Sequence, residues 1–346
     1  MKKGVSGSRI KKFFPLFPVG IIILLNGCNK NKFDVNVSDI DVSVKIQRFE
    51  KDLFSIPLDS IESNIPRLRK QYGNFFPLFN HMIINVGSSS NPGYPDLLRS
   101  FVTDYSIYED YKEVMKKFPD LNFLEKELTD AFKHYRYYFQ SKPIPKIITY
   151  ISGFNQSVVT DSAMIGISLD KYLGKDEELY KRIAPPISQY MLDRMTKAKM
   201  PSDCMQALAD MEFVYNNKVN NLVNNMIYGG KIMYFVKAML PNEPDSLIWG
   251  FSAAQMNFCN KAEKEMWTYL VESKLLFNND KFTISKFINE GPFTKDFGKN
   301  SPARAAVWIG YRIVNTYMDH NNKLSLQGLM YENDYQKILN QSRYDP

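Results

Sequence analysis

The chain has 346 residues, of which 44% are hydrophobic, 14% aromatic and 23% charged, and its formal net charge is +7. This composition excludes an intrinsically disordered chain and a fibrous repeat, and the length is sufficient for one large domain or two small ones. Residues 1–27 hold five of the 44 lysines and arginines and no acidic residue, so the remainder has 39 basic residues against 37 acidic ones. This near-neutral remainder has no general basic surface for a nucleic-acid backbone.

The N-terminus has the features of an export signal. Its basic residues precede a 13-residue apolar run from Phe13 to Leu25, and a small residue, Gly27, stands before Cys28. This order is typical of a secretory signal, and the run is shorter than the roughly 20 residues that a bilayer-spanning helix needs.

The four residues that end at Cys28 resemble the lipobox of bacterial lipoproteins, which implies cleavage before Cys28 and acylation (palmitate) of its thiol. The alternative is a signal peptide without lipidation. We therefore predict a lipoprotein signal peptide over 1–27, the acylated cysteine and a polar tether over 28–42, and a single domain over 43–346. Residues 29–32 lack the acidic cluster of surface-exported lipoproteins, which favours a periplasm-facing anchor. We place this anchor in the outer rather than the inner membrane.

The first half of the body is predicted to be mainly helical. Apolar and polar residues alternate over 44–49, which indicates a half-buried strand, and two or three short helices are expected up to residue 86. A loop is predicted over 87–93. Amphipathic helices are predicted over 95–117 and 122–139, the second with a capping box formed by Asn122 and Glu125.

A single block of the sequence favours a sheet. Residues 147–151, 157–159 and 164–168 are three short runs of β-prone residues separated by turn residues. From about residue 176 onward the pattern is helical again, so we expect a mostly helical α+β fold with one small β-sheet.

Three later helices have recognisable start signals. A long helix is predicted over 220–240, and a second begins with a capping box of Ser252 and Gln255 and extends toward residue 273. A third is expected to begin at Ser301, as N-cap before a proline, and to reach about residue 319. Cys204 and Cys259 are compatible with either a disulfide or two buried free thiols.

No catalytic or metal-binding pattern is present in the sequence. The three histidines are far apart and belong to no zinc-binding spacing, and no phosphate-binding or dinucleotide-binding glycine loop occurs. Residues 166–170 begin like a nucleophile elbow but lack its second glycine. We therefore predict no enzyme activity and no cofactor.

Several segments together resemble the gliding-motility lipoprotein GldB family, and their order and spacing hold over nearly the whole mature chain. These segments are Val44–Lys51, Pro145–Ile151, Ile165–Gly174, Asn225–Lys231, Glu265–Trp267, Phe287–Asn289, Ser301–Arg304 and Trp308–Tyr311. The resemblance implies a membrane-anchored component of the gliding apparatus without enzymatic activity. Its implied partners are the membrane, through the N-terminal lipid, and envelope proteins such as gliding or secretion machinery, with no nucleic acid.

The layout also resembles, more distantly, zinc metallopeptidases in which a short sheet precedes a metal-binding helix. In that register Gln206 and Asp210 replace the two histidine ligands, Ala207 replaces the general base, and Gly229 stands near the position of the third ligand. Zinc sites need about three protein donors and catalysis needs a base. The resemblance therefore implies a degenerate zinc-metallopeptidase-like architecture, a pseudoenzyme that retains the shape for binding.

The leading hypothesis is a non-catalytic, lipid-anchored lipoprotein of the cell envelope that supports gliding motility or a related envelope process through protein–protein contacts. The predicted interaction surface includes Lys231, Tyr135 and Tyr137. The alternatives are an envelope lipoprotein that binds a glycan or peptide through its tyrosine-rich surface, and an envelope hydrolase of unrecognised class.

Overall fold

The computed structural model describes residues 1–4, 7, 31–216 and 218–346, so Cys28 and most of the predicted export signal lie outside the described residues. The chain divides after Lys32, and the fold is that of the unit Phe33–Pro346. This unit begins before the predicted domain start at residue 43. Phe33 is buried, with its ring edge-on to Tyr234 at 4.8 Å, so part of the predicted tether packs against the core.

A four-stranded sheet forms where the alternating and β-prone segments were predicted. Its strands are β1 Ile46–Arg48, β2 Lys146–Tyr150, β3 Val158–Asp161 and β4 Met164–Ser168, in the order β1-β2-β4-β3. The strands β1, β2 and β4 are parallel, and β3 pairs with β4 in the antiparallel sense. The first strand comes from a segment about a hundred residues before β2, which the local pattern alone could not place.

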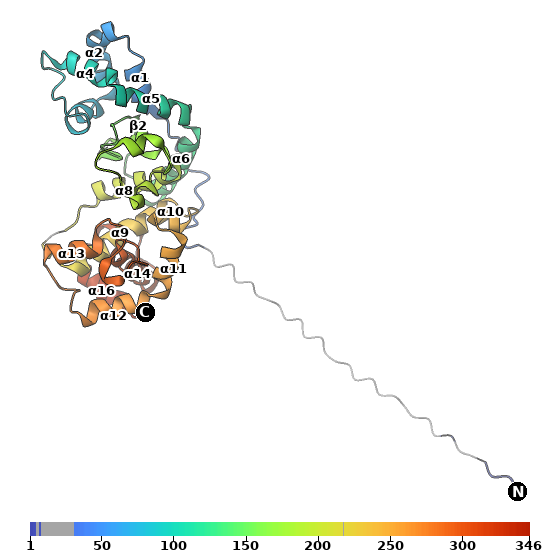
Figure 1. Ribbon diagram of the computed structural model, residues 1–346. Coiled ribbons are helices and arrows are strands. Elements are labelled where there is room, and N and C mark those ends of the chain that lie inside the picture. The colour runs from blue at the N-terminus through green and yellow to red at the C-terminus, as the bar shows by residue number, and fades with distance from the viewer. Residues whose placement is uncertain (5–6, 8–30, 217) are drawn as a thin grey trace. The chain divides into compact units, whose positions relative to one another are not determined.

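Alternation along the strands divides the hydrophobic side chains between two faces of the sheet. One face, with Ile148, Tyr150 and Met164, packs on the first four helices of the chain, and the other, with Ile147 and Ile165, shares a core with the two helices just before β2 and with the helices that follow the sheet. In Figure 1 the blue and cyan helices α1, α2 and α4 accordingly lie on one side of β2, and the yellow to red helices lie on the other. The helices before β2 are α1 Phe49–Phe54, α2 Ile61–Tyr72, α3 Phe75–Leu78, α4 Tyr94–Thr103, α5 Tyr105–Lys117 and α6 Asn122–Tyr138.

The predicted helix over 95–117 is wrong as a single element, because Asp104 separates α4 from α5. The Asp104 side chain accepts hydrogen bonds from the backbone nitrogens of Ser106 and Ile107, and so caps a new helix. The helix over 122–139 is confirmed, but its predicted capping box is not. Glu125 instead accepts hydrogen bonds from Lys45 Nζ and from the backbone of Ile46, both at 3.0 Å, and thereby holds β1.

The C-terminal half is helical, as predicted. Its helices are α7 Gln189–Leu192, α8 Met200–Glu212, α9 Leu222–Met239, α10 Asp245–Trp249, α11 Ala253–Lys261, α12 Glu263–Glu272, α13 Lys281–Ile288, α14 Ala305–His320, α15 Leu326–Tyr331 and α16 Tyr335–Ser342. The capping box of Ser252 and Gln255 is confirmed, although the helix it opens ends at Lys261 and α12 is a separate element. None of the helices within the described ranges is long and apolar enough to cross a membrane.

The helix predicted to begin at Ser301 begins later, at Ala305. The Ser301 hydroxyl donates to backbone carbonyls of the preceding loop, and Thr294 Oγ1 accepts from the backbone nitrogen of Ala305 at 3.2 Å. Arg304, the residue before the helix, has φ 58° and ψ 24°. A non-glycine residue in this left-handed region is uncommon and strained, and here it directs the arginine side chain inward.

Two glycines allow the central helices α9 and α14 to cross in backbone contact. A Cβ on Gly230 would lie 2.3 Å from the carbonyl carbon of Gly310, and a Cβ on Gly310 would lie 1.8 Å from the carbonyl oxygen of Met226. The two backbones approach too closely for any side chain at either position, which explains the glycines.

Candidate functional site

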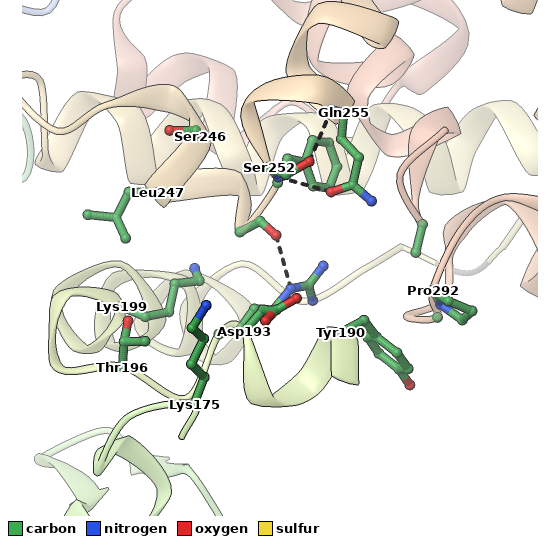
Figure 2. Close-up of a pocket in the computed structure, with 15 residues that line it drawn as sticks. Lys175, Tyr190, Asp193, Thr196, Lys199, Ser246, Leu247, Ser252, Gln255 and Pro292 are labelled. Carbon is green, nitrogen blue, oxygen red and sulfur yellow. Dashed lines mark hydrogen bonds between the residues drawn. The ribbon is translucent and has the colours of Figure 1, made fainter. Parts of the chain in front are cut away.

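A charged cleft lies between the segment after the sheet and the C-terminal helices. It consists of two adjoining cavities of about 490 and 230 Å³ that share Tyr190, Arg194 and Lys199. These volumes together fall in the range of small-ligand sites. Figure 2 shows Lys175 and Lys199 on one wall of the larger cavity, with Ser246 and Leu247 on the wall opposite.

The cleft is built from segments that are far apart in the sequence. Residues 171–175 follow β4, residues 190–199 connect α7 to α8, residues 246–255 span α10 and the start of α11, and residues 290–304 precede α14. The charged side chains that line its two cavities are Lys171, Lys175, Asp193, Arg194, Lys199, Asp203, Glu290 and Arg304.

Two arginines share one carboxylate at the junction of the cavities. Glu290 pairs with Arg194 Nη1 through one oxygen and with Arg304 Nε, at 3.0 Å, through the other. Each guanidinium is also held by a backbone carbonyl: Arg194 Nε donates to Gly250 at 3.2 Å, and Arg304 Nη2 donates to Trp249 at 3.1 Å. These contacts fix the two guanidinium groups in place and join the segment after α7 to the segment before α14.

A second ion pair lies at the start of α8. Lys199 Nζ is 3.0 Å from Asp203 Oδ1 and also donates to Ser202 Oγ and to the backbone carbonyl of Ile248. Tyr172 OH donates to the other oxygen of Asp203 at 2.9 Å. All three donors of the Lys199 ammonium are therefore used within the protein.

Lys171 is differently placed. It is 9% exposed, lines the smaller cavity, and donates to the backbone carbonyl of Phe154 at 3.1 Å. Burial lowers the pKa of Lys171, and the charge of the neighbouring Asp170 opposes that shift. Asp170 is fully buried and is itself hydrogen-bonded to Ser168 and to the backbone nitrogens of Ser152 and Phe154.

The positions predicted to replace a metal site are divided between α8 and α9, and Gln206 lines the smaller cavity of the cleft. Gln206, Ala207 and Asp210 lie on α8, and Tyr228 OH makes a long hydrogen bond of 3.5 Å to Asp210 Oδ1. Gly229 lies at the crossing of α9 and α14, where a Cβ would meet Val307 Cγ1 at 2.8 Å. Within the described residues no three His, Cys, Asp or Glu side chains are close enough together to hold a metal ion.

Two of the three residues predicted for an interaction surface are buried. Lys231 is 2% exposed, and its Nζ donates to the backbone carbonyls of Met330 and Glu332. Tyr135 is fully buried and donates to Glu212. Tyr137 is 44% exposed. Lys231 and Tyr135 are thus structural in this fold, and of the three only Tyr137 is accessible to a partner.

The two remaining cysteines are free thiols. Cys204 on α8 and Cys259 on α11 are both buried, and no disulfide joins them. Burial raises the pKa of both thiols, to about 12 for Cys259, so neither is a reactive nucleophile at neutral pH.

Of the candidate site residues named from the sequence, Gln206 lines the smaller cavity, but the charged residues of the cleft were not singled out. Lys171 and Arg304 belong to segments that carry the family resemblance, Ile165–Gly174 and Ser301–Arg304, and this was the signal that pointed toward them. Arg194 and Glu290 had no such signal, because their pairing depends on two segments almost a hundred residues apart.

Comparison with known proteins identified one family. The family model described as gliding motility protein GldB matches residues 30–346, which is nearly the whole chain. No curated protein and no solved structure matches the chain.

Proposed function

The chain belongs to the GldB gliding-motility lipoprotein family, and from this premise we propose that it supports gliding motility, or a related envelope process, by binding other proteins. In this proposal Cys28 carries the lipid that anchors the protein in the outer membrane, and the body of the protein faces the periplasm. The helical body then acts as a non-catalytic interaction module of the cell envelope.

The family match is the observation that carries this proposal. It begins at residue 30, two residues after Cys28, and continues to the last residue. The family relationship therefore concerns the whole body that would remain after cleavage of the signal peptide.

The use of the degenerate metal positions supports a role without catalysis. Zinc hydrolysis chemistry needs about three protein ligands and a base close to the bound water. Gln206 and Ala207 supply neither imidazole nor base, and Gly229 has no side chain that could ligate a metal. The zincin-like architecture remains a prediction from the sequence.

The experiment that tests this function is crosslinking and affinity capture of the tagged full-length protein from its native envelope. The Cys28→Ser variant, which has no thiol to acylate, is the matched control. We expect subunits of motility or secretion machinery to be captured with the wild type and lost with the variant. Efficient crosslinking that returns only bulk lipoproteins would contradict the interaction role.

Metal content is a second, independent measurement. The purified protein is expected to contain no stoichiometric zinc, because its metal-motif positions lack imidazole ligands. One zinc ion per chain would contradict the non-catalytic role.

A further inference from the structure

The charged cleft has more cationic than anionic side chains on its lining. Five lysines and arginines line the two cavities, compared with three carboxylates, at Asp193, Asp203 and Glu290. The buried Asp170 lies behind Lys171 but does not line the cleft, and its oxygens are already hydrogen-bonded. The lining alone therefore has an excess of two positive charges.

The carboxylates of the cleft are already engaged by the protein. Both oxygens of Glu290 pair with arginines, and both oxygens of Asp203 are held by Lys199 and Tyr172. Asp193 Oδ1 accepts from Gln189 at 2.9 Å. The acceptors are thus largely satisfied without a ligand.

The donors, in contrast, are not exhausted. A guanidinium has five N–H groups and a lysine ammonium has three. Within the described residues, Arg194 uses one nitrogen for Glu290 and one for a backbone carbonyl, and Lys171 makes one hydrogen bond. Arg304 donates from Nη2 to Trp249, whereas its buried Nε, 3.0 Å from Glu290 Oε1, makes no hydrogen bond to any described residue. Lys175 makes no hydrogen bond or ion pair to any described residue and is exposed on the wall of the larger cavity. The cleft therefore has more positively charged hydrogen-bond donors than its own acceptors use.

Two of the cations with unused donors are buried, which indicates that they gain from a bound anion. Lys171 and Arg304 are each 9% exposed, so solvent has little access to their remaining N–H groups. A buried cation whose donors are incompletely used gains most from an anionic acceptor, because charge-assisted hydrogen bonds are the strong ones. The strained backbone of Arg304 is consistent with a side chain held for binding.

The shape of the cleft suits an extended ligand. The smaller cavity holds Lys171, Arg194 and Arg304, and the larger one continues past Leu247 and Phe251. An acidic group in the smaller cavity would leave room for neighbouring residues of the same ligand in the larger one.

We propose that this cleft binds an acidic peptide segment of a partner protein, with a carboxylate of that segment received by Lys171, Arg194 and Arg304. That the ligand is part of a protein rests on the proposed function, whereas its negative charge follows from the cleft itself.

The test is a binding titration of the detergent-solubilised full-length protein. Its probes are an acidic hexapeptide of alternating glutamate and serine, the matched glutamine–serine hexapeptide, and inorganic phosphate. The variants are Lys171→Gln and Lys175→Gln in the cleft and, as matched control, Lys281→Gln at an exposed lysine on α13 outside it.

We expect the acidic peptide to bind at least about tenfold more tightly than the glutamine peptide, and to bind more weakly as salt is added. Lys171→Gln should weaken binding about tenfold or more, because a hydrogen bond to a charged group is lost. Lys175→Gln should weaken it by a smaller factor without affecting folding, since that side chain is exposed. Lys281→Gln should leave it unchanged.

Three results would overturn the proposal: equal affinity for the two peptides, equal loss in the control and cleft variants, or binding of phosphate alone. Failure of this inference is distinguishable from failure of the proposed function. If the acidic peptide does not bind while affinity capture still returns motility subunits, the cleft proposal alone is rejected. If the peptide binds through Lys171 but capture returns no such subunits, the proposed function alone is rejected.

Discussion

Replacing Gly310 by alanine should separate the two central helices. The Cβ of alanine would lie 1.8 Å from the carbonyl oxygen of Met226 in α9, and ordinary van der Waals contact begins near 3.4 Å. The difference requires a local displacement of about 1.6 Å between α9 and α14, because backbone atoms cannot turn away as a side chain can.

The cost can be worked from the side chains around the crossing. Met226, Ile227, Ile309 and Ile313 are fully buried, and each contributes about 2 kcal/mol by burial. A gap of about 1 Å removes up to roughly half of the dispersion energy, so loosening all four costs about 4 kcal/mol. Alanine regains about 1 kcal/mol through its higher helix propensity, and the net loss in free energy of unfolding for Gly310→Ala is about 3 kcal/mol.

Equilibrium urea unfolding followed by tryptophan fluorescence measures this loss, since Trp308 lies on α14 next to the crossing. The matched control is Gly328→Ala in α15, where the closest atom to the new Cβ would be the flexible end of Leu324, Cδ1 at 2.7 Å, and no backbone atom is among its three nearest contacts. We expect the control to change stability by less than about 1 kcal/mol. A Gly310→Ala protein that is as stable as wild type, or no less stable than the control, would refute the reasoning.

Three further predictions follow from buried groups. Asp110 is 1% exposed with no hydrogen-bond partner for either oxygen among the described residues, and burial, then the charge of Asp170, raises its pKa to about 8. The folded state therefore binds more protons than the unfolded state between about pH 4 and pH 8, so stability falls as pH rises through this window. Asp110→Asn should reduce that fall in urea unfolding, and an unchanged pH profile would contradict this. Lys231→Met should lower the free energy of unfolding in urea by about 1–3 kcal/mol, because it leaves the backbone carbonyls of Met330 and Glu332 unpaired. An unchanged free energy of unfolding would show that these carbonyls find other donors. Cys204 and Cys259 should both be unreactive toward a thiol reagent in the native protein, and both should react after unfolding without reductant. A reaction of either thiol in the native protein would show that it is accessible to solvent.

Local sequence patterns predicted several elements, although they did not give the partner of β1, which pairs with β2 about a hundred residues later. The three β-prone runs became β2, β3 and β4, and the capping box of Ser252 and Gln255 formed as expected. The alternation over 44–49 likewise indicated β1. In each case the pattern of side chains along a few residues is sufficient to select the backbone conformation.

Three of the predictions that failed concern side chains that bond to partners the local pattern did not indicate. Glu125 was expected to cap its own helix, but its carboxylate accepts the backbone N–H of Ile46 in β1. Ser301 was expected to start a helix, but its hydroxyl is bonded within the preceding loop, and Thr294 caps α14 instead. Lys231 was expected at a surface, but its ammonium satisfies carbonyls at the end of α15.

The sequence by itself determined the family, the mostly helical α+β class and the absence of histidine ligands at the metal-like positions, because each depends on residue identity and short-range order. Only the tertiary structure decided the charged cleft. Arg194, Glu290 and Arg304 meet because the segment after α7 lies beside the loop before α14, and the cleft beside them brings in residues that follow β4. Burial and unused hydrogen-bond donors are properties of that packed arrangement, since every one of these side chains would be fully hydrated in the unfolded chain.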